Sequence, residues 1–327
     1  MKNKSLIKAL RIGAVVIACL LFVLYFIYFG EKVLFARFFL NADREMRTPG
    51  ISEGYVPQGF DYLEDKEIFL ATGYMKDKSP SRIYILDKNG KITDMAEMKK
   101  SNGKDYTGHT GGIARFGNFV YISGGDGCDV FLLSDLLDGD GIVTMVGEIK
   151  TGNDPAYCKV FDGKLYAGSF YYTEGGYDKN NQFMMTTPAG DTNTGIITVW
   201  SLDPVTGLAK SDAPDIMYST TSKVQGMYMD GDRIYLSTSW GLTVSHLYTY
   251  TLEGDLTGNT YDFNGTSVPL VYLDSSMLTD DLRMPPMAEE IVVLDNKIYV
   301  MNESACTKYI FGNLTSGRHI YAYELDN

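Results

Sequence analysis

The sequence has few of the residues on which catalytic and metal sites usually depend. It contains three histidines and four cysteines in 327 residues, and no two cysteines stand at the short spacing of a zinc site. It also has no phosphate-binding Walker loop and no His-x-x-x-His pair. These shortages exclude the common P-loop and zinc-enzyme classes.

Positive charge is scarce outside the N-terminus. The chain carries a formal charge of −12, and residues 1–47 contain eight basic and three acidic side chains. Because that segment contributes +5, the rest carries −17, and so acidic a surface repels phosphate backbones. We therefore expect no nucleic-acid partner. Helical periodicity is also nearly absent after residue 48, which disfavours α/β and helical-repeat folds.

The one long hydrophobic run lies near the N-terminus. Residues 12–29 hold no charged side chain, and as a helix with Gly30 they extend about 28 Å, close to the ~30 Å hydrocarbon core of a bilayer. Four basic residues and no acidic one stand among the first eleven, so the positive-inside rule places the N-terminus in the cytoplasm. The pattern predicts an uncleaved signal-anchor.

A cleaved signal peptide and a lipid anchor are the alternatives for this run. A cleaved signal peptide would have an apolar region of about 7–15 residues ending in small side chains, whereas this run ends in Tyr and Phe. Lipid attachment at Cys19 would leave ten bulky apolar residues after the modified cysteine. The expected organisation is a cytoplasmic basic tail at 1–11, a transmembrane helix at 12–30, a juxtamembrane stalk at 31–47, partly an interfacial helix, and one extracytoplasmic domain at 48–327.

An internal repeat organises the extracytoplasmic domain. Five segments share one order: a start that contains Gly or Ala, a short apolar strand, a tight polar turn, and a second strand with an aromatic residue. Two apolar runs around such a turn form a β-hairpin. The five segments begin at Pro57, Thr110, Pro155, Val224 and Met287.

A third apolar strand follows each hairpin. Three to four antiparallel strands per unit of about 45–70 residues are typical of a propeller blade. The sequence therefore predicts an all-β fold, a five-bladed β-propeller, with room for a sixth blade at 173–195 and 256–285. A β-sandwich would not explain the recurring order. Because the last repeat ends after three strands, a segment between about Asp43 and Val56 is expected to supply the fourth and close the ring.

Several short motifs carry a resemblance. They are Pro57-Gln58-Gly59, Gly108-His109-Thr110-Gly111-Gly112, Gln225-Gly226 and Pro285-Pro286-Met287-Ala288-Glu289-Glu290. Through these motifs, residues 55–325 resemble a group of uncharacterised secreted or membrane-anchored bacterial β-propeller proteins. The resemblance implies the propeller fold and indicates no specific chemistry.

The starts of the five hairpins are the candidate site. The innermost strand of each propeller blade begins near the central channel, so these positions should converge at one opening. They carry amide, imidazole and carboxylate side chains, which suit hydrogen bonding or cation binding. The predicted ligand-binding residues of this funnel are Gln58, His109, Tyr157, Gln225, Glu289, Glu290 and Glu303.

A structural role is the alternative for some of these residues. Gln58 and Gln225 can simply satisfy backbone groups at the channel mouth. Glu289 and Glu290 are adjacent on a strand and point to opposite faces, so we expect Glu289 in the channel and Glu290 against a neighbouring blade. Glu303 ends the second strand of its hairpin, which places it at the opposite rim or in an inter-blade contact.

Two further expectations concern cysteines and function. Cys128 and Cys158 either form a disulfide or lie buried as thiols. The expected function is that of a membrane-anchored recognition module whose funnel binds a small molecule, a glycan or an envelope protein. The alternative is an extracellular hydrolase or lyase with His109 and Glu289 as catalytic candidates. A divalent cation such as calcium is an open option, and no other cofactor is indicated.

Overall fold

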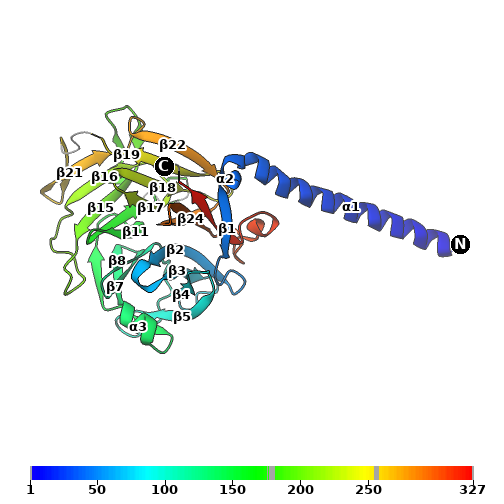
Figure 1. Cartoon of the computed structure of the whole chain (residues 1–327), viewed down its shortest axis with the longest axis horizontal. Coiled ribbons are helices and arrows are strands. Elements are labelled where there is room, and N and C mark those ends of the chain that lie inside the picture. The colour runs from blue at the N-terminus through cyan, green and yellow to red at the C-terminus, as the bar shows by residue number, and fades with distance from the viewer. Residues whose placement is uncertain (1, 175, 177–180, 254–257, 326–327) are drawn as a thin grey trace.

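The structure is a computed structural model that describes residues 2–174, 176, 181–253 and 258–325. A long N-terminal helix, α1 (Lys2–Leu34), leads into a ring of five β-sheets around a common axis (Figure 1). The prediction of an all-β propeller with five blades is confirmed. Residues Leu6–Leu34 of α1 are long and apolar enough to cross a membrane, and the helix projects away from the propeller, which it contacts near its C-terminal end.

Blades 1 and 2 come first along the chain, and in each the strands run antiparallel from the axis outward. Blade 1 contains β2 (Tyr55–Leu63), β3 (Ile68–Met75), β4 (Arg82–Asp87), β5 (Ile92–Lys99) and, parallel at its outer edge, β9 (Ile142–Thr144). Blade 2 contains β6 (Ile113–Phe116), β7 (Phe119–Gly124), β8 (Gly127–Leu132) and β10 (Gly147–Lys150). Short helices, η1 (Glu64–Lys66) and α3 (Leu133–Asp138), lie in the connections.

Blades 3 and 4 follow the same plan. Blade 3 contains β11 (Pro155–Phe161), β12 (Lys164–Ser169), β15 (Gly195–Ser201) and β16 (Ile216–Thr220). Blade 4 contains β17 (Val224–Asp230), β18 (Arg233–Thr238), β19 (Ser245–Thr251) and β22 (Leu278–Met284). The inner hairpin of blade 3 turns at Asp162-Gly163, where both φ angles are positive, as the favoured two-residue hairpin turn requires.

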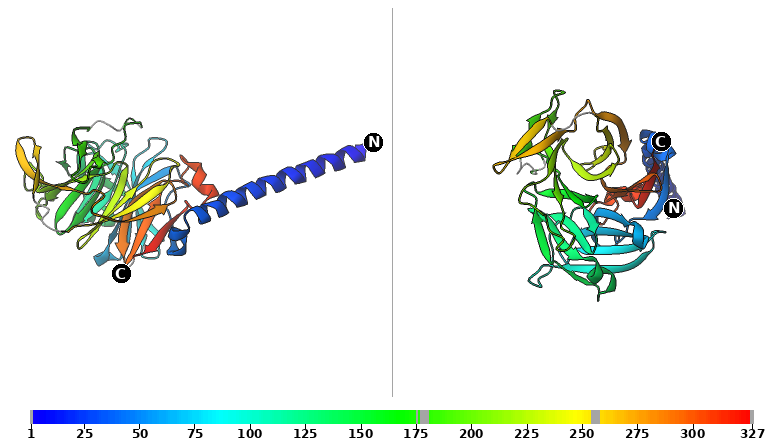
Figure 2. Two further views of the ribbon diagram at one scale, coloured as in Figure 1. Left: turned by 90° about the horizontal axis from the view of Figure 1, so that it is seen from above. Right: turned by 60° about the vertical axis from the view of Figure 1, so that its left-hand side comes forward.

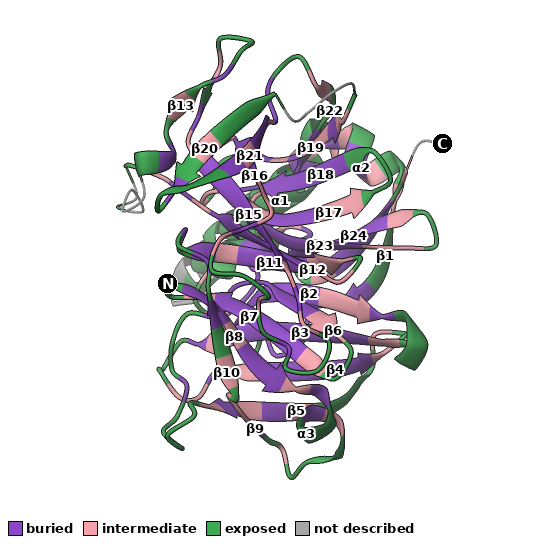
Figure 3. Ribbon diagram, turned by 90° about the vertical axis from the view of Figure 1, so that its left-hand side faces the viewer, coloured by how far each residue is buried: buried purple, intermediate pink, exposed green. Residues whose placement is uncertain are grey.

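Of the two segments that left room for a sixth blade, one adds strands to existing blades and the other forms a small separate sheet. Strands β20 (Asn259–Phe263) and β21 (Thr266–Tyr272) form a hairpin, and β21 pairs in parallel with β16 at the outer edge of blade 3. The other insertion contains η2 (Asn181–Phe183) and a small hairpin of β13 (Met185–Thr186) and β14 (Thr192–Asn193). Neither insertion forms a sixth blade in the part of the chain that the structure describes. Figure 3 shows the outer hairpins exposed and the inner strands buried.

Blade 5 closes the ring with strands from both ends of the chain. It contains β23 (Ala288–Leu294), β24 (Lys297–Asn302), β25 (His319–Glu324) and β1 (Ala42–Arg47). Strand β1 pairs antiparallel with β25, with Asp43 opposite Ala322 and Arg47 opposite His319. The predicted closure by a segment near Asp43 is confirmed, and the last six residues of the expected stalk therefore belong to the propeller.

The connection between α1 and blade 5 is tightly packed. Helix α2 (Ala36–Leu40) follows α1, and Phe35 and Phe38 are buried, with the Phe38 ring stacked on Tyr323. Arg37 forms an ion pair with Asp280 of blade 4 at 2.7 Å. The stalk is helical as expected, but two of its aromatic side chains pack against the propeller, because a buried ring contributes more here than one left at a membrane surface.

Candidate functional site

Four innermost strands carry a β-bulge at the same point of the repeat. A bulge adds one residue to a strand and re-aims the neighbouring side chains. These bulges lie where the inner strands begin, and we call that end of the propeller the mouth. The bulged residues are Gln58 in β2, Ala156 in β11, Gln225 in β17 and Glu289-Glu290 in β23.

Four side chains from three blades form one hydrogen-bonded group, which we call the mouth cluster: Gln58, Gln225, Glu289 and Glu303. Gln58 Nε2 donates to Glu303 Oε2 at 2.9 Å, and Gln225 Nε2 donates to Glu289 Oε1 at 3.4 Å. The carboxyl groups of Glu289 and Glu303 are in hydrogen-bond contact with each other. The structure thus brings together four of the seven residues predicted from the sequence.

The two carboxyl groups hold a proton near neutral pH. Burial, reinforced by the charge of Glu303, raises the pKa of Glu289 well above its ordinary value of 4.5. Burial also raises the pKa of Glu303 to about 7, although Lys308, Glu289 and Gln58 act in the opposite direction. Two adjacent buried carboxylates cannot both ionise easily, so the pair can donate and accept hydrogen bonds.

His109 lies beside the mouth cluster. Its ring packs on Tyr74 with 4.7 Å between ring centroids, and the Tyr74 hydroxyl accepts a hydrogen bond from Lys308 Nζ. His109 remains exposed to solvent, yet protein surrounds it closely. This enclosure, followed by the charge of Lys308, lowers the pKa of His109 to about 4, so the ring is neutral at pH 7. Within the described residues, no hydrogen bond or ion pair joins His109 to Glu289.

A cavity of about 520 Å³ opens at His109. Its walls are the loop before β6, the turn between β7 and β8, and strand β10. Within it, the Tyr106 hydroxyl donates to Asp129 Oδ2 at 2.7 Å, and burial raises the pKa of Asp129. The volume falls in the range of about 300–1,000 Å³ that is usual for small-molecule sites.

Aromatic side chains at the ends of the second strands surround the mouth. Tyr74 lies near the end of β3, whereas Tyr172 and Trp240 follow shortly after β12 and β18, and all three are half-buried. The rings of Tyr172 and Trp240 have centroids 4.7 Å apart. Lys223 Nζ lies 4.3 Å from the Tyr172 ring centre, and Lys308 Nζ lies 4.7 Å from that of Tyr309.

Charged side chains fill the channel behind the mouth cluster. Lys159 Nζ of blade 3 reaches across the axis to blade 1, where it donates to Asp61 Oδ1 at 3.2 Å and to the Phe60 carbonyl oxygen. Glu290 Oε1 accepts the Met227 N–H at 3.2 Å, and its Oε2 has no hydrogen-bond partner among the described residues. Burial raises the pKa of Glu290 to about 8, against the lowering effect of Lys159.

The remaining predicted residues have other positions. Glu290 contacts blade 4 as expected, but it also lies in the channel and faces Lys159, so the expectation that only Glu289 reaches the channel is wrong. The bulge at Glu289-Glu290 interrupts the strict alternation of side chains on which that expectation depended. Tyr157 is fully buried in the core between blades 3 and 4 and does not join the mouth cluster. Glu303 lies at the mouth in an inter-blade contact with Gln58, so its alternative placement at the opposite rim is wrong.

Neither a metal cluster nor a disulfide is found in the residues that the structure describes. No group of three or more His, Cys, Asp or Glu side chains is arranged to hold a metal ion there. All four cysteines are free thiols, and Cys128 and Cys158 lie buried in hydrogen-bond contact with each other.

Sequence reasoning missed Lys159 and Asp61. A signal was present, because the two residues occupy the same position in two of the aligned repeats, four residues after Pro155 and Pro57. Opposite charges at equivalent positions of a ring face one axis and can pair. Lys308 and Tyr309 were missed as well, since they lie in a loop outside the repeat.

Comparisons with known proteins give a likeness of fold only. No protein-family model matches the chain, and no curated protein matches it. Among solved structures, it is similar to glutaminyl cyclase of Myxococcus xanthus at 12% identity and a TM-score of 0.46, covering 87% of this chain and 96% of that one. It is also similar to an exo-β-1,3-galactanase of Phanerochaete chrysosporium at 12% identity and a TM-score of 0.46, covering 86% of this chain and 63% of that one.

Proposed function

We propose that this protein is a membrane-anchored recognition module that binds a neutral, hydroxyl-rich ligand such as a glycan at the mouth of its propeller. The mouth cluster carries the proposal. Sugar hydroxyls both donate and accept hydrogen bonds, and the proton-holding pair of Glu289 and Glu303, with the amides of Gln58 and Gln225, can do the same.

The surroundings of the mouth cluster favour a neutral ligand over a cation. Half-buried Tyr74, Tyr172 and Trp240 border the mouth with aromatic surface that the apolar face of a sugar ring can contact. A cationic ligand would compete with Lys223 and Lys308, which already occupy aromatic faces at the rim. The cavity at His109 adds space for a second part of the ligand.

Anchoring in the cell membrane, with the propeller outside, is part of the proposal. Supporting it are the mean hydropathy of 2.7 in the apolar window of α1, the absence of burial along that window, and the basic residues that precede it. An envelope protein bound at the same face remains the alternative partner.

Equilibrium titration of the full chain in lipid nanodiscs with a panel of neutral and charged oligosaccharides tests the proposal. For a neutral sugar that binds, Gln225→Leu should weaken binding about tenfold or more, because one hydrogen bond to a polar group is lost at a half-buried position. Asn89→Leu, an exposed position in the β4–β5 turn, is the matched control and should leave binding unchanged. If none of the sugars binds, the proposal of a sugar ligand is rejected. If Gln225→Leu and Asn89→Leu bind a sugar equally well, the mouth is rejected as the binding site.

The same carboxyl pair favours a second candidate, an extracellular hydrolase or lyase. A carboxyl group with a pKa near 7 suits general acid–base catalysis, and Glu303 has such a value. Product analysis of the same panel separates the two functions. Cleavage of a sugar that is abolished by Glu303→Gln, while binding persists, would establish enzymatic activity. If all the sugars stay intact, the enzyme candidate is rejected and the recognition function stands.

A further inference from the structure

The loop between β24 and β25 exposes a compact apolar patch. Within it, helix η3 (Ile310–Leu314) presents Ile310, Phe311 and Leu314 to solvent with exposed fractions of 62%, 56% and 45%. Single exposed apolar side chains are ordinary on a protein surface, but three within five residues form a patch of the kind that contacts a partner or a membrane. We call this set the η3 patch.

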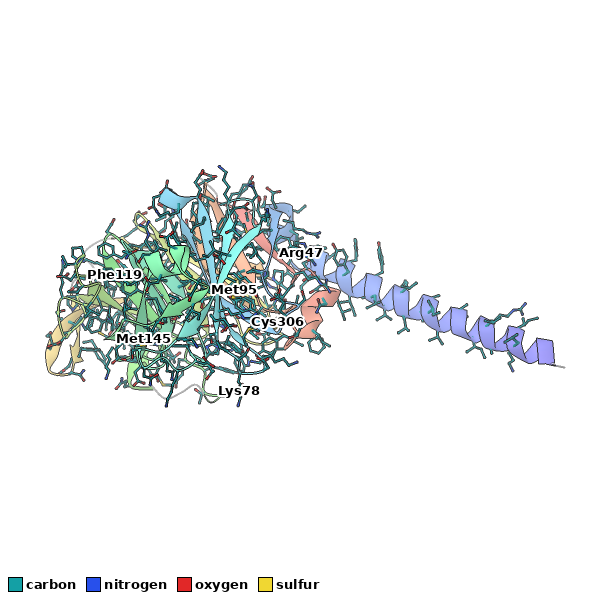
Figure 4. All side chains as sticks on the ribbon, turned by 90° about the horizontal axis from the view of Figure 1, so that it is seen from below. Arg47, Lys78, Met95, Phe119, Met145 and Cys306 are labelled. Carbon is teal, nitrogen blue, oxygen red and sulfur yellow. The ribbon has the colours of Figure 1, made fainter. Side chains whose placement is uncertain are left out.

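The η3 patch is fixed beside the C-terminal end of α1. Glu31 of α1 accepts two hydrogen bonds from Ser316, from its N–H at 3.0 Å and from its hydroxyl at 2.9 Å. Lys32 Nζ donates to the same hydroxyl at 2.6 Å. Figures 1 and 2 show the loop next to the base of α1, and Figure 4 places Cys306, in the same loop, on that side of the propeller. The position of the patch relative to the apolar helix is therefore set by buried hydrogen bonds.

Basic side chains adjoin the patch on a chain that is otherwise acidic. Arg44, Arg47 and Arg318 are exposed, and together with Lys32 they surround His319, at the start of β25. Arg44 also reaches Tyr28 of α1. Lys32, Arg44 and Arg47 come from residues 1–47, which carry +5, whereas residues 48–327 carry −17 in total. Positive charge is therefore concentrated at this corner of the molecule. Cationic side chains held within a Debye length of a bilayer are attracted to anionic lipid headgroups.

We propose that the η3 patch is a second membrane contact: Ile310, Phe311 and Leu314 enter the headgroup region of the bilayer that α1 spans, and the adjoining arginines bind anionic lipid headgroups. The inference rests on the anchoring part of the proposed function. It places an edge of blade 5 against the bilayer. Because the same loop carries Lys308 and Tyr309, the mouth would open next to the membrane surface.

Quenching of tryptophan fluorescence by brominated lipid tests this contact in the full chain. Three single variants are reconstituted in bilayers of phosphatidylcholine with phosphatidylglycerol, with or without brominated acyl chains. Phe311→Trp reports on the patch, Tyr25→Trp on the anchor, and Val205→Trp on an exposed turn of blade 3, where Val205 is 83% exposed. The signal of Trp200 and Trp240 in the unsubstituted chain is subtracted.

Bromine should remove roughly one third or more of the added emission of Phe311→Trp and Tyr25→Trp, and almost none of that of Val205→Trp. In bilayers without phosphatidylglycerol, quenching of Phe311→Trp should fall, and Arg318→Gln should remove this lipid dependence. If Tyr25→Trp is quenched and Phe311→Trp is not, the patch faces water or a protein partner, and the inference is overturned while the anchor stands. If Tyr25→Trp is not quenched, the anchor itself fails.

Discussion

Replacing Glu290 with glutamine should stabilise the protein, and only at neutral and alkaline pH. The side chain is fully buried in the channel, where it faces Lys159 and, beyond it, Asp61. Its pKa is raised by burial to about 8. Glutamine has nearly the same shape, and its carbonyl oxygen can still accept the Met227 N–H.

The sign and size of the effect follow from the raised pKa. Below about pH 4.5, Glu290 is protonated in the folded and the unfolded chain, so its titration does not affect stability. Between 4.5 and about 8, only the unfolded chain releases the proton, and the free energy of unfolding falls as pH rises. The full difference between the pKa of Glu290 in the unfolded and in the folded chain corresponds to about 5 kcal/mol of unfolding free energy. Relaxation and water entry reduce such penalties, so we expect about 2–4 kcal/mol of stabilisation by Glu290→Gln at pH 8.

Urea unfolding of the full chain in detergent micelles, followed by tryptophan fluorescence at pH 5, 6.5 and 8, measures this difference. The gain in unfolding free energy from Glu290→Gln should be below about 1 kcal/mol at pH 5 and should grow as the pH rises. Glu253→Gln, at an exposed position, is the control and should change stability by no more than about 0.5 kcal/mol at any pH. An increment that is the same at all three pH values, or a loss of stability at pH 8, would show that folded Glu290 is ionised and paired with Lys159.

Three further substitutions test the packing by the same unfolding measurement. Gly112→Ala should lower the free energy of unfolding by more than about 2 kcal/mol, because the new Cβ would lie 2.3 Å from the Cys158 nitrogen. Gly258→Ala is the control and should be neutral, because a Cβ there meets nothing within 4 Å. Equal effects of the two substitutions would contradict tight packing of the channel. Met46→Ala should cost about 2–4 kcal/mol, since the buried Met46 side chain belongs to the closing strand, and no loss would mean that β1 is dispensable. Phe38→Ala should cost about 3–5 kcal/mol if α2 docks on blade 5, and an unchanged midpoint would show a free linker.

Most of the fold could be predicted because its signals are local. Alternating apolar residues and turn residues such as Asp162-Gly163 recur in each repeat, and they define hairpins without reference to distant parts of the chain. The ring closure was predictable too, because a missing fourth strand in the last repeat had to come from elsewhere. The segment 256–285 was ambiguous, since it contains both the fourth strand of blade 4, β22, and the hairpin of β20 and β21. That hairpin joins the edge of blade 3 through a parallel pairing that no local pattern encodes.

The site divides in the same way. Gln58, Gln225 and Glu289 occupy one repeat position, and a ring geometry brings that position to one opening. Tyr157 lies on an innermost strand too, but Ala156 is the residue of that strand that is equivalent to Gln58 and Gln225. The side chain of Tyr157, one position later, points into the core between blades. The pairing of Glu289 with Glu303 depends on how far β24 extends toward the mouth, and that distance is a property of the assembled blade.

The sequence alone therefore determined the apolar helix, the number of repeats and the set of polar residues that approach the axis, because each depends on neighbours a few positions away. Only the tertiary structure decided which of these residues touch, that Lys159 crosses the channel to Asp61, and that the η3 patch lies against the base of α1. Such contacts join residues about one hundred to nearly three hundred positions apart, and they form only when all five blades are packed around the axis.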